Sequence, residues 1–255
     1  MTVLPIVERE LRVAARRGAT YWTRLVGALA AVVVGAAVFM FTFGLSPAQT
    51  GRYAFEGLAG VMLLHCLAYG RRSTADCLSV EKREGTLGLL FLTDLKGHDV
   101  VLGKLAATSV TGFYGLLAVF PVLALPLLLG GISSGELWRV ALVLVDTFLF
   151  SLAIGMLSSA LSRDLRRAMA ANLLLLLFFM AVPPACAFAL TYFAPRLPAP
   201  APLFFSCPVY SFFLCDDTQY RSAPSHFWWS LGVIHGLTWL LLLVAGWIVP
   251  RSWQD

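Results

Sequence analysis

The stretch MAANLLLLLFFMAVPPACAFALTYF, residues 169–193, has no charged side chain and decides the kind of fold that this chain adopts. A helix needs roughly 20 mostly apolar residues to cross the hydrocarbon core of a bilayer. This stretch is long enough, and similar stretches recur along the chain. We therefore expect an integral membrane protein.

The composition supports the same expectation. Of the 255 residues, 59% are hydrophobic and 13% are charged, and the mean hydropathy is +0.80. Soluble proteins average about 45–50% apolar and about 25% charged residues, and disordered chains combine low hydrophobicity with high charge. The composition excludes both of these classes.

Six stretches are candidates for membrane-spanning helices. The third contains Pro121 and Pro126, which should kink it, and the fifth contains Pro183 and Pro184, where the helix should bend or stop. We predict an all-α polytopic protein with one transmembrane domain over residues 1–255. The six predicted spans are approximately residues 22–43, 53–69, 100–129, 138–161, 169–193 and 227–249.

The distribution of Lys and Arg predicts the orientation. With six spans, four of the 19 basic residues, Arg52, Arg139, Arg196 and Arg221, fall on one side, and the others fall on the side of both termini. Positively charged segments stay in the cytoplasm, so we expect both termini there. This placement accounts for the net charge of +5 without a nucleic-acid partner.

Two segments outside the predicted spans have their own character. Residues 4–20 place Val7 and Leu11 on one helical face and Arg12 and Arg16 on another, which indicates an amphipathic helix on the cytoplasmic membrane surface. The alternative for this segment is a solvated basic tail.

The second such segment, residues 194–225, is rich in proline and lies on the exterior side. Its apolar middle, residues 203–214, is too short to span and should form a short helix or a re-entrant piece. Cys207 and Cys215 lie on this oxidising side, where they either form a disulfide or are two buried free thiols. The five cysteines include no CxxC pair, so no metal site is predicted.

Three ionisable residues, His65, Asp146 and His235, and the polar Asn172 fall well inside the predicted spans. Ionisable groups in hydrocarbon are costly, and their default interpretation is functional. Asp146 and Asn172 are candidates for lining a translocation path, with the alternative that Asp146 joins helices by hydrogen bonds. His65 and His235 either pack between helices or form a bis-histidine haem site.

The cytoplasmic loop 71–99 contains the most informative motif, SVEKREGTLGLLFLTD, residues 79–94. A charged cluster is followed by a glycine and then by an apolar run, residues 87–92. Such a run would be bare in the cytosol, so it needs a partner surface or the membrane interface to cover it.

This loop resembles that of the permease subunits of type-2 ATP-binding-cassette (ABC) transporters, which carry a pattern close to E-R-E-x-G-T-L-x-x-L-L-x-T-P and then L-G-K. The matching tripeptide here is Leu102-Gly103-Lys104, and the chain departs from the pattern at Asp94, where the family often has proline. The predicted layout of spans is also similar. The residues that match the pattern or belong to its apolar run are Glu81, Arg83, Glu84, Gly85, Thr86, Leu87, Leu89, Leu90 and Phe91, together with Thr93.

The resemblance implies a coupling helix that docks on a separate cytoplasmic ATPase. Glu81, Arg83 and Glu84 would orient the contact, and the Leu and Phe side chains would be its buried anchors. It also implies a second permease copy or a related chain, an exporter, and the inner membrane of a bacterium. Residues 162–167 would be a second cytoplasmic contact or only a positively charged topology signal.

The chain by itself is not expected to be an enzyme. Residues 97–105, GHDVVLGKL, come closest to a P-loop, but the glycines are one residue too far apart and Leu105 replaces the required Ser or Thr. ATP and Mg²⁺ would therefore bind to the partner ATPase, and no cofactor is expected on this chain. The competing hypothesis is a non-transport membrane subunit, haem-binding or anchoring, or an intramembrane enzyme.

Overall fold

The computed structural model describes residues 44–85, 96–193 and 201–251, and part of a helix between residues 29 and 42. The predicted interfacial helix 4–20, most of the first predicted span, and residues 194–200 lie outside the described residues. So do Thr86, Leu87, Leu89, Leu90 and Phe91, which the sequence predicts to be coupling residues.

All regular structure in the described residues is helical, as predicted. Within the described ranges, four helices are long and apolar enough to cross a membrane: α6 (Gly97–Leu128), α7 (Ser134–Leu161), α8 (Leu165–Phe193) and α12 (Pro224–Ile248). The remaining elements are α3 (Pro47–Ser73), α4 (Ser79–Glu84), α9 (Ala201–Phe204), α10 (Pro208–Phe213) and α11 (Asp217–Ser222).

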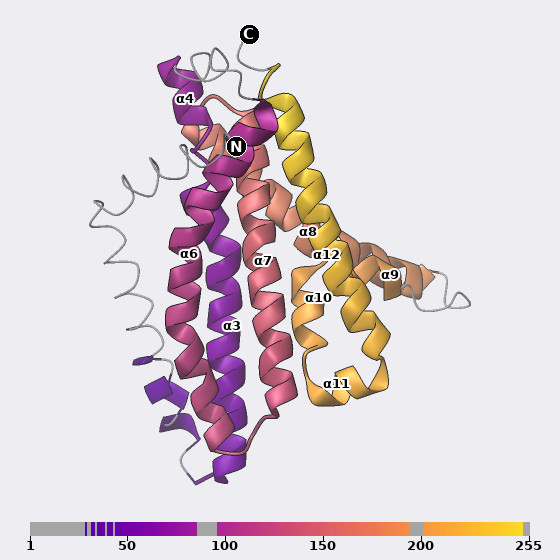
Figure 1. Ribbon diagram of the computed structural model, residues 1–255. Helices are drawn as coiled ribbons and strands as arrows, with labels where there is room; N and C mark the ends of the chain where they lie inside the picture. The colour runs from indigo at the N-terminus through magenta and orange to yellow at the C-terminus, as the bar shows by residue number, and fades with distance from the viewer. Residues whose placement is uncertain are drawn as a thin grey trace.

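Helices α3, α6, α7 and α12 form a bundle, and α8 leaves it to end beside α9 (Figure 1). Helix α3 covers the second predicted span and extends beyond it at both ends, where it carries Arg52 and Arg71. The short helices α10 and α11 fold back between α7 and α12 at one end of the bundle, and α4 lies at the opposite end (Figure 1). The bundle therefore carries a compact polar element at each end.

Local sequence signals begin and end these helices. Ser46 caps α3 by accepting a hydrogen bond from the Gln49 N–H, and Ser133 caps α7 by accepting one from the Glu136 N–H at 3.1 Å. Gly85, with φ of +70°, ends α4 in the left-handed conformation that glycine adopts without strain.

The prolines do not end their helices, which corrects one alternative given for the fifth span. Helix α8 continues through Pro183 and Pro184 to Phe193. Pro184 lacks an N–H group, so the carbonyl oxygen of Met180 loses its helical partner. The Cys207 thiol donates a hydrogen bond to this oxygen, at 3.8 Å. A neighbouring side chain thus satisfies the backbone group that the proline frees.

Helix α7 is the centre of the bundle. Most of its residues are buried, and it packs against α3, α6, α8, α10 and α12. The other candidate spans expose large apolar side chains. In α12 the exposed Trp229 and Trp247 are about 27 Å apart at the helical rise of about 1.5 Å per residue. This separation is close to the thickness of the hydrocarbon core, where tryptophans mark the two interfaces.

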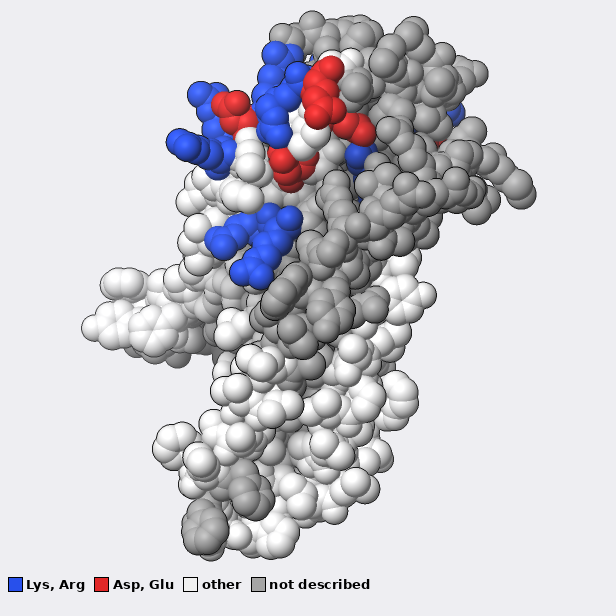
Figure 2. All heavy atoms as spheres, turned by 90° about the vertical axis from the view of Figure 1, so that its left-hand side faces the viewer, with Lys and Arg blue, Asp and Glu red and all other residues white. Residues whose placement is uncertain are grey.

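Charged side chains occupy only part of the surface. On the face turned to the viewer in Figure 2, the Lys, Arg, Asp and Glu side chains of the described residues gather toward one end, and the other described residues visible there are uncharged. An uncharged surface of this kind suits contact with lipid.

Helices α3 and α7 approach closely at two glycines. A Cβ atom on Gly70 would lie 1.9 Å from the Ser151 carbonyl oxygen, and one on Gly155 would lie 1.9 Å from Thr74 Oγ1. The Ser151 hydroxyl donates to the Cys66 carbonyl oxygen at 2.6 Å across the same contact. Small residues allow such close packing in membranes, where helix association depends on van der Waals contact and interhelical hydrogen bonds.

We expect Gly70→Ala to destabilise the protein by about 1–3 kcal/mol, because the new methyl group would overlap the α7 backbone. The measurement is thermal unfolding of the detergent-purified protein. Gly60→Ala in the same helix is the matched control, since its Cβ would meet nothing within 4 Å. Equal unfolding temperatures for the two variants would contradict the close contact.

Candidate functional site

At the cytoplasmic end predicted from the sequence, α4 is fixed to the end of α7. Ser159 Oγ accepts hydrogen bonds from the backbone N–H groups of Leu78 and Ser79, at 2.8 and 3.0 Å. Lys82 donates to the Ala160 carbonyl oxygen, and Arg83 donates to that of Arg163 at 3.0 Å. Lys82 thus caps the carbonyl end of α7, the end of a helix that favours positive charge, and Arg83 holds the turn that follows α7.

Arg83 also pairs with Asp76, at 3.0 Å, within the same loop. Burial, together with the nearby positive charge of Arg163, lowers the pKa of Lys82. The loop 74–85 and the turn between α7 and α8 therefore form one hydrogen-bonded unit. This turn contains residues 162–164, part of the second predicted cytoplasmic contact.

An ion pair joins the two parts of the sequence that resemble the permease pattern, residues 79–94 and the tripeptide Leu102-Gly103-Lys104. Glu81 Oε1 lies 2.8 Å from Lys104 Nζ, and the two side chains are 19% and 10% exposed. Glu81 belongs to the charged cluster, and Lys104 is the lysine of the L-G-K tripeptide in α6. The pair thus joins α4, which precedes residues 86–95, to α6, which follows them.

The other predicted coupling residues that the structure describes are exposed. Arg83, Glu84 and Gly85 lie at the surface where α4 ends. They lead directly into residues 86–95, which are outside the described residues. The predicted charged cluster is thus divided: Glu81 and Arg83 have partners within the protein, and Glu84 stands at the edge of the loop.

Removing one member of the Glu81–Lys104 pair should cost about 3 kcal/mol, because the other charge would remain largely buried. We expect a double-mutant cycle with Glu81→Gln and Lys104→Met to give a coupling energy of about 1–2 kcal/mol from unfolding temperatures. The exposed pair Asp164–Arg167 is the control, for which we expect less than about 0.5 kcal/mol. Additive effects of Glu81→Gln and Lys104→Met would refute the pair.

In the membrane region, Asp146 joins two helices, which is one of the two alternatives given for it. Asp146 of α7 lies 2.9 Å from Nδ1 of His235 in α12. The indole N–H of Trp239 donates to Nε2 of the same histidine at 3.0 Å. Both ring nitrogens of His235 therefore take part in hydrogen bonds between or within these helices.

Asn172 does not share this location. It is buried within about the first two turns of α8, whereas Asp146 lies near the middle of α7. A short turn joins the end of α7 to the start of α8, so the two residues lie at different distances from this turn. They do not form one polar patch.

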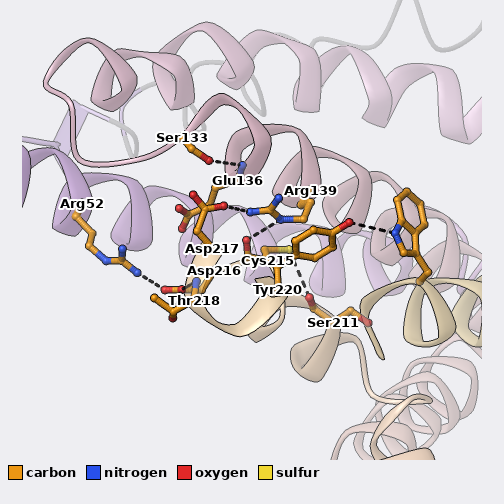
Figure 3. A network of polar contacts seen from close by, with 11 residues as sticks. Arg52, Ser133, Glu136, Arg139, Ser211, Cys215, Asp216, Asp217, Thr218 and Tyr220 are labelled. Carbon is orange, nitrogen blue, oxygen red and sulfur yellow. Dashed lines mark hydrogen bonds and ion pairs between the residues drawn. The ribbon is translucent and has the colours of Figure 1, made fainter. Parts of the chain in front are cut away.

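At the opposite end of the bundle, a polar network holds the exterior segment (Figure 3). Arg52 of α3 pairs with Asp216, and Arg139 of α7 pairs with Asp217. Arg139 also donates to the Cys215 carbonyl oxygen at 2.9 Å and lies over the Tyr220 ring at 4.2 Å from its centroid. Two of the four basic residues assigned to the exterior thus fasten α10 and α11 to the bundle.

Sequence reasoning did not find this network, although a signal for it was present. Arg52 and Arg139 are rare cations on a side otherwise poor in basic residues, and Asp216 and Asp217 are adjacent in the exterior segment. Their pairing could have been proposed from opposite charge alone. Which arginine meets which aspartate depends on the packing of α11.

Cys207 and Cys215 are free, buried thiols, so the disulfide alternative is wrong for this structure. The six-residue helix α10 lies between them and rises about 9 Å, whereas bridged cysteines need Cα atoms within about 7 Å. Cys215 donates to the Ser211 carbonyl oxygen instead, and burial raises the pKa of its thiol to about 12.

The pH dependence of the exterior network follows from its two aspartates. Burial opposes their ionisation, but it is outweighed by hydrogen bonds, from Thr218 to Asp216 and from Ser133 and Arg139 to Asp217, and by the positive charges of Arg52 and Arg139. The pKa of each carboxyl group is lowered below the ordinary value of 3.8. The two carboxylates therefore contribute their full stabilisation above pH 3.8, the ordinary pKa of the unfolded chain. This stabilisation is lost as the pH falls through their lower pKa in the folded protein.

We expect the double variant Asp216→Asn, Asp217→Asn to unfold at a lower temperature than the wild type at about pH 6. The difference should shrink as the pH falls below about 4, because the wild-type carboxylates then become protonated. Asp164→Asn, at an exposed cytoplasmic pair, is the control and should keep the wild-type profile. A difference that is independent of pH would speak against the ion pairs.

No protein-family model matches the sequence, and a comparison with curated proteins finds no significant match.

Proposed function

We propose that this chain is the membrane-spanning permease subunit of an ATP-driven ABC transporter, an exporter in the inner membrane of a bacterium. In this proposal a separate cytoplasmic ATPase hydrolyses ATP, and loop 71–99 couples the hydrolysis to movement of the membrane helices. The chain works as a homodimer or with a related chain, beside two ATPase subunits. It has six spans, with both termini in the cytoplasm.

The observation that carries the proposal is the attachment of the loop to two spanning helices. Glu81 binds Lys104 of α6, and Lys82 caps the end of α7. A loop that only connected two spans would not need these contacts. A loop that receives force from a partner does need them, because the force must reach the membrane helices.

The apolar run of the loop supports the same proposal. Residues 87–92, LGLLFL, directly follow the exposed end of α4. In a docking contact, aromatic and aliphatic anchors supply most of the binding energy, and charges at the rim orient the partner. Glu84 has the exposure that a rim residue needs.

The test is recovery of the ATPase. The tagged protein is extracted from its native membranes in mild detergent, and co-purifying proteins and ATP hydrolysis are measured. We expect a stoichiometric P-loop ATPase with the wild type and its loss with Phe91→Asp, which places an unpaired charge in an apolar contact.

Phe91→Leu is the matched control, since it keeps an apolar side chain and should retain the ATPase. Membrane insertion should be equal in all three proteins. If the wild type is recovered without an ATPase, or if Phe91→Asp retains it, the coupling proposal is wrong.

A further inference from the structure

The Asp146–His235–Trp239 chain lies at the middle of the membrane region. Asp146 is near the middle of α7, and His235 is near the middle of α12. The Asp146 side chain is 8% exposed, whereas the His235 side chain is 53% exposed. The chain of hydrogen bonds thus leads from the half-exposed surface of α12 to a buried carboxyl group.

The hydrogen-bond donors around His235 indicate which tautomer of its ring fits these contacts. An indole N–H is a donor only, so Nε2 of His235 must accept the hydrogen bond from Trp239 and carries no proton. The proton of the neutral ring is then on Nδ1, which donates to Asp146 Oδ1. These two contacts fit the neutral ring with its proton on Nδ1.

A neutral histidine leaves Asp146 without a counter-ion among the described residues. Among the described residues of the helices that pack against α7, namely α3, α6, α8, α10 and α12, His235 is the titratable group that acts on the Asp146 carboxyl group. An ionised Asp146 would be an uncompensated charge in a medium of low dielectric constant. Burying a charge of this kind costs far more than burying a neutral acid.

The surroundings of the second carboxyl oxygen of Asp146, Oδ2, indicate how its charge can be neutralised. Asp146 Oδ2 is enclosed and has no hydrogen-bond partner among the described residues. No ligand of appreciable size can reach an oxygen that is closed off from the surface. A proton can bind there without displacing any side chain.

We propose that Asp146 is a proton-binding site at the middle of the membrane, with His235 and Trp239 as its positioning residues. A proton taken from water binds to Oδ2, and the net charge of the pair changes from −1 to 0. Trp239 keeps His235 neutral, because an imidazolium Nε2–H could not accept the indole hydrogen bond. Proton binding is thereby linked to the packing of α12 on α7, independently of the cytoplasmic loop.

Infrared spectroscopy of the purified full-length chain in lipid nanodiscs tests this site. A protonated carboxyl group gives a C=O stretching band that is distinct from the carboxylate bands and shifts in D₂O. At neutral pH we expect such a band in the wild type and its complete loss in Asp146→Asn. Glu136→Gln, which removes another buried carboxyl group of α7, is the control and should keep the Asp146 component.

If Asp146→Asn fails to fold, the wild type labelled with ¹³C-aspartate serves instead, and the acid band should shift with the label. Trp239→Phe should weaken the band, because His235 can then become the cation and leave Asp146 ionised. The absence of an aspartic acid band at neutral pH would overturn the proton site. An unchanged band in Trp239→Phe would overturn the role assigned to Trp239.

Discussion

The packing of α7 among its neighbours is the constraint on which the rest of the structure depends. Its backbone approaches that of α3 so closely that neither Gly70 nor Gly155 leaves room for a methyl group. Inside a bilayer there is no water to drive helices together, so close contact and interhelical hydrogen bonds must do so. The Ser151–Cys66 and Thr74–Leu152 hydrogen bonds add this second component.

The three polar regions described above each include residues of α7. At the end predicted to be cytoplasmic, Ser159 and the Ala160 carbonyl group hold α4. In the middle, Asp146 binds His235 of α12. At the opposite end, Arg139 holds Asp217 and the Cys215 carbonyl group. A displacement of α7 would therefore alter its contacts with α4, with α12 and with residues 215–217.

This arrangement gives the proposed transporter a physical route for coupling. A partner that pulls on the loop acts on α6 through Lys104 and on α7 through the residues that cap its end. The exterior segment opposes such movement, because Asp216 ties it to α3 and Asp217 ties it to α7. If the helices of the proposed transporter separated at this end, the ion pairs would either break or move together with the helices that carry them.

The sequence by itself determined the class of the protein: apolar helices, a charged loop after the second predicted span, and an exterior segment too short to cross. These properties depend on the local density of apolar side chains, which composition and length reveal. Only the tertiary structure decided the partners of the polar residues. Asp146 meets His235 across 89 positions, and Arg139 meets Asp217 across 78. Such pairs depend on helix rotation and depth, and no local pattern in a single sequence records these quantities.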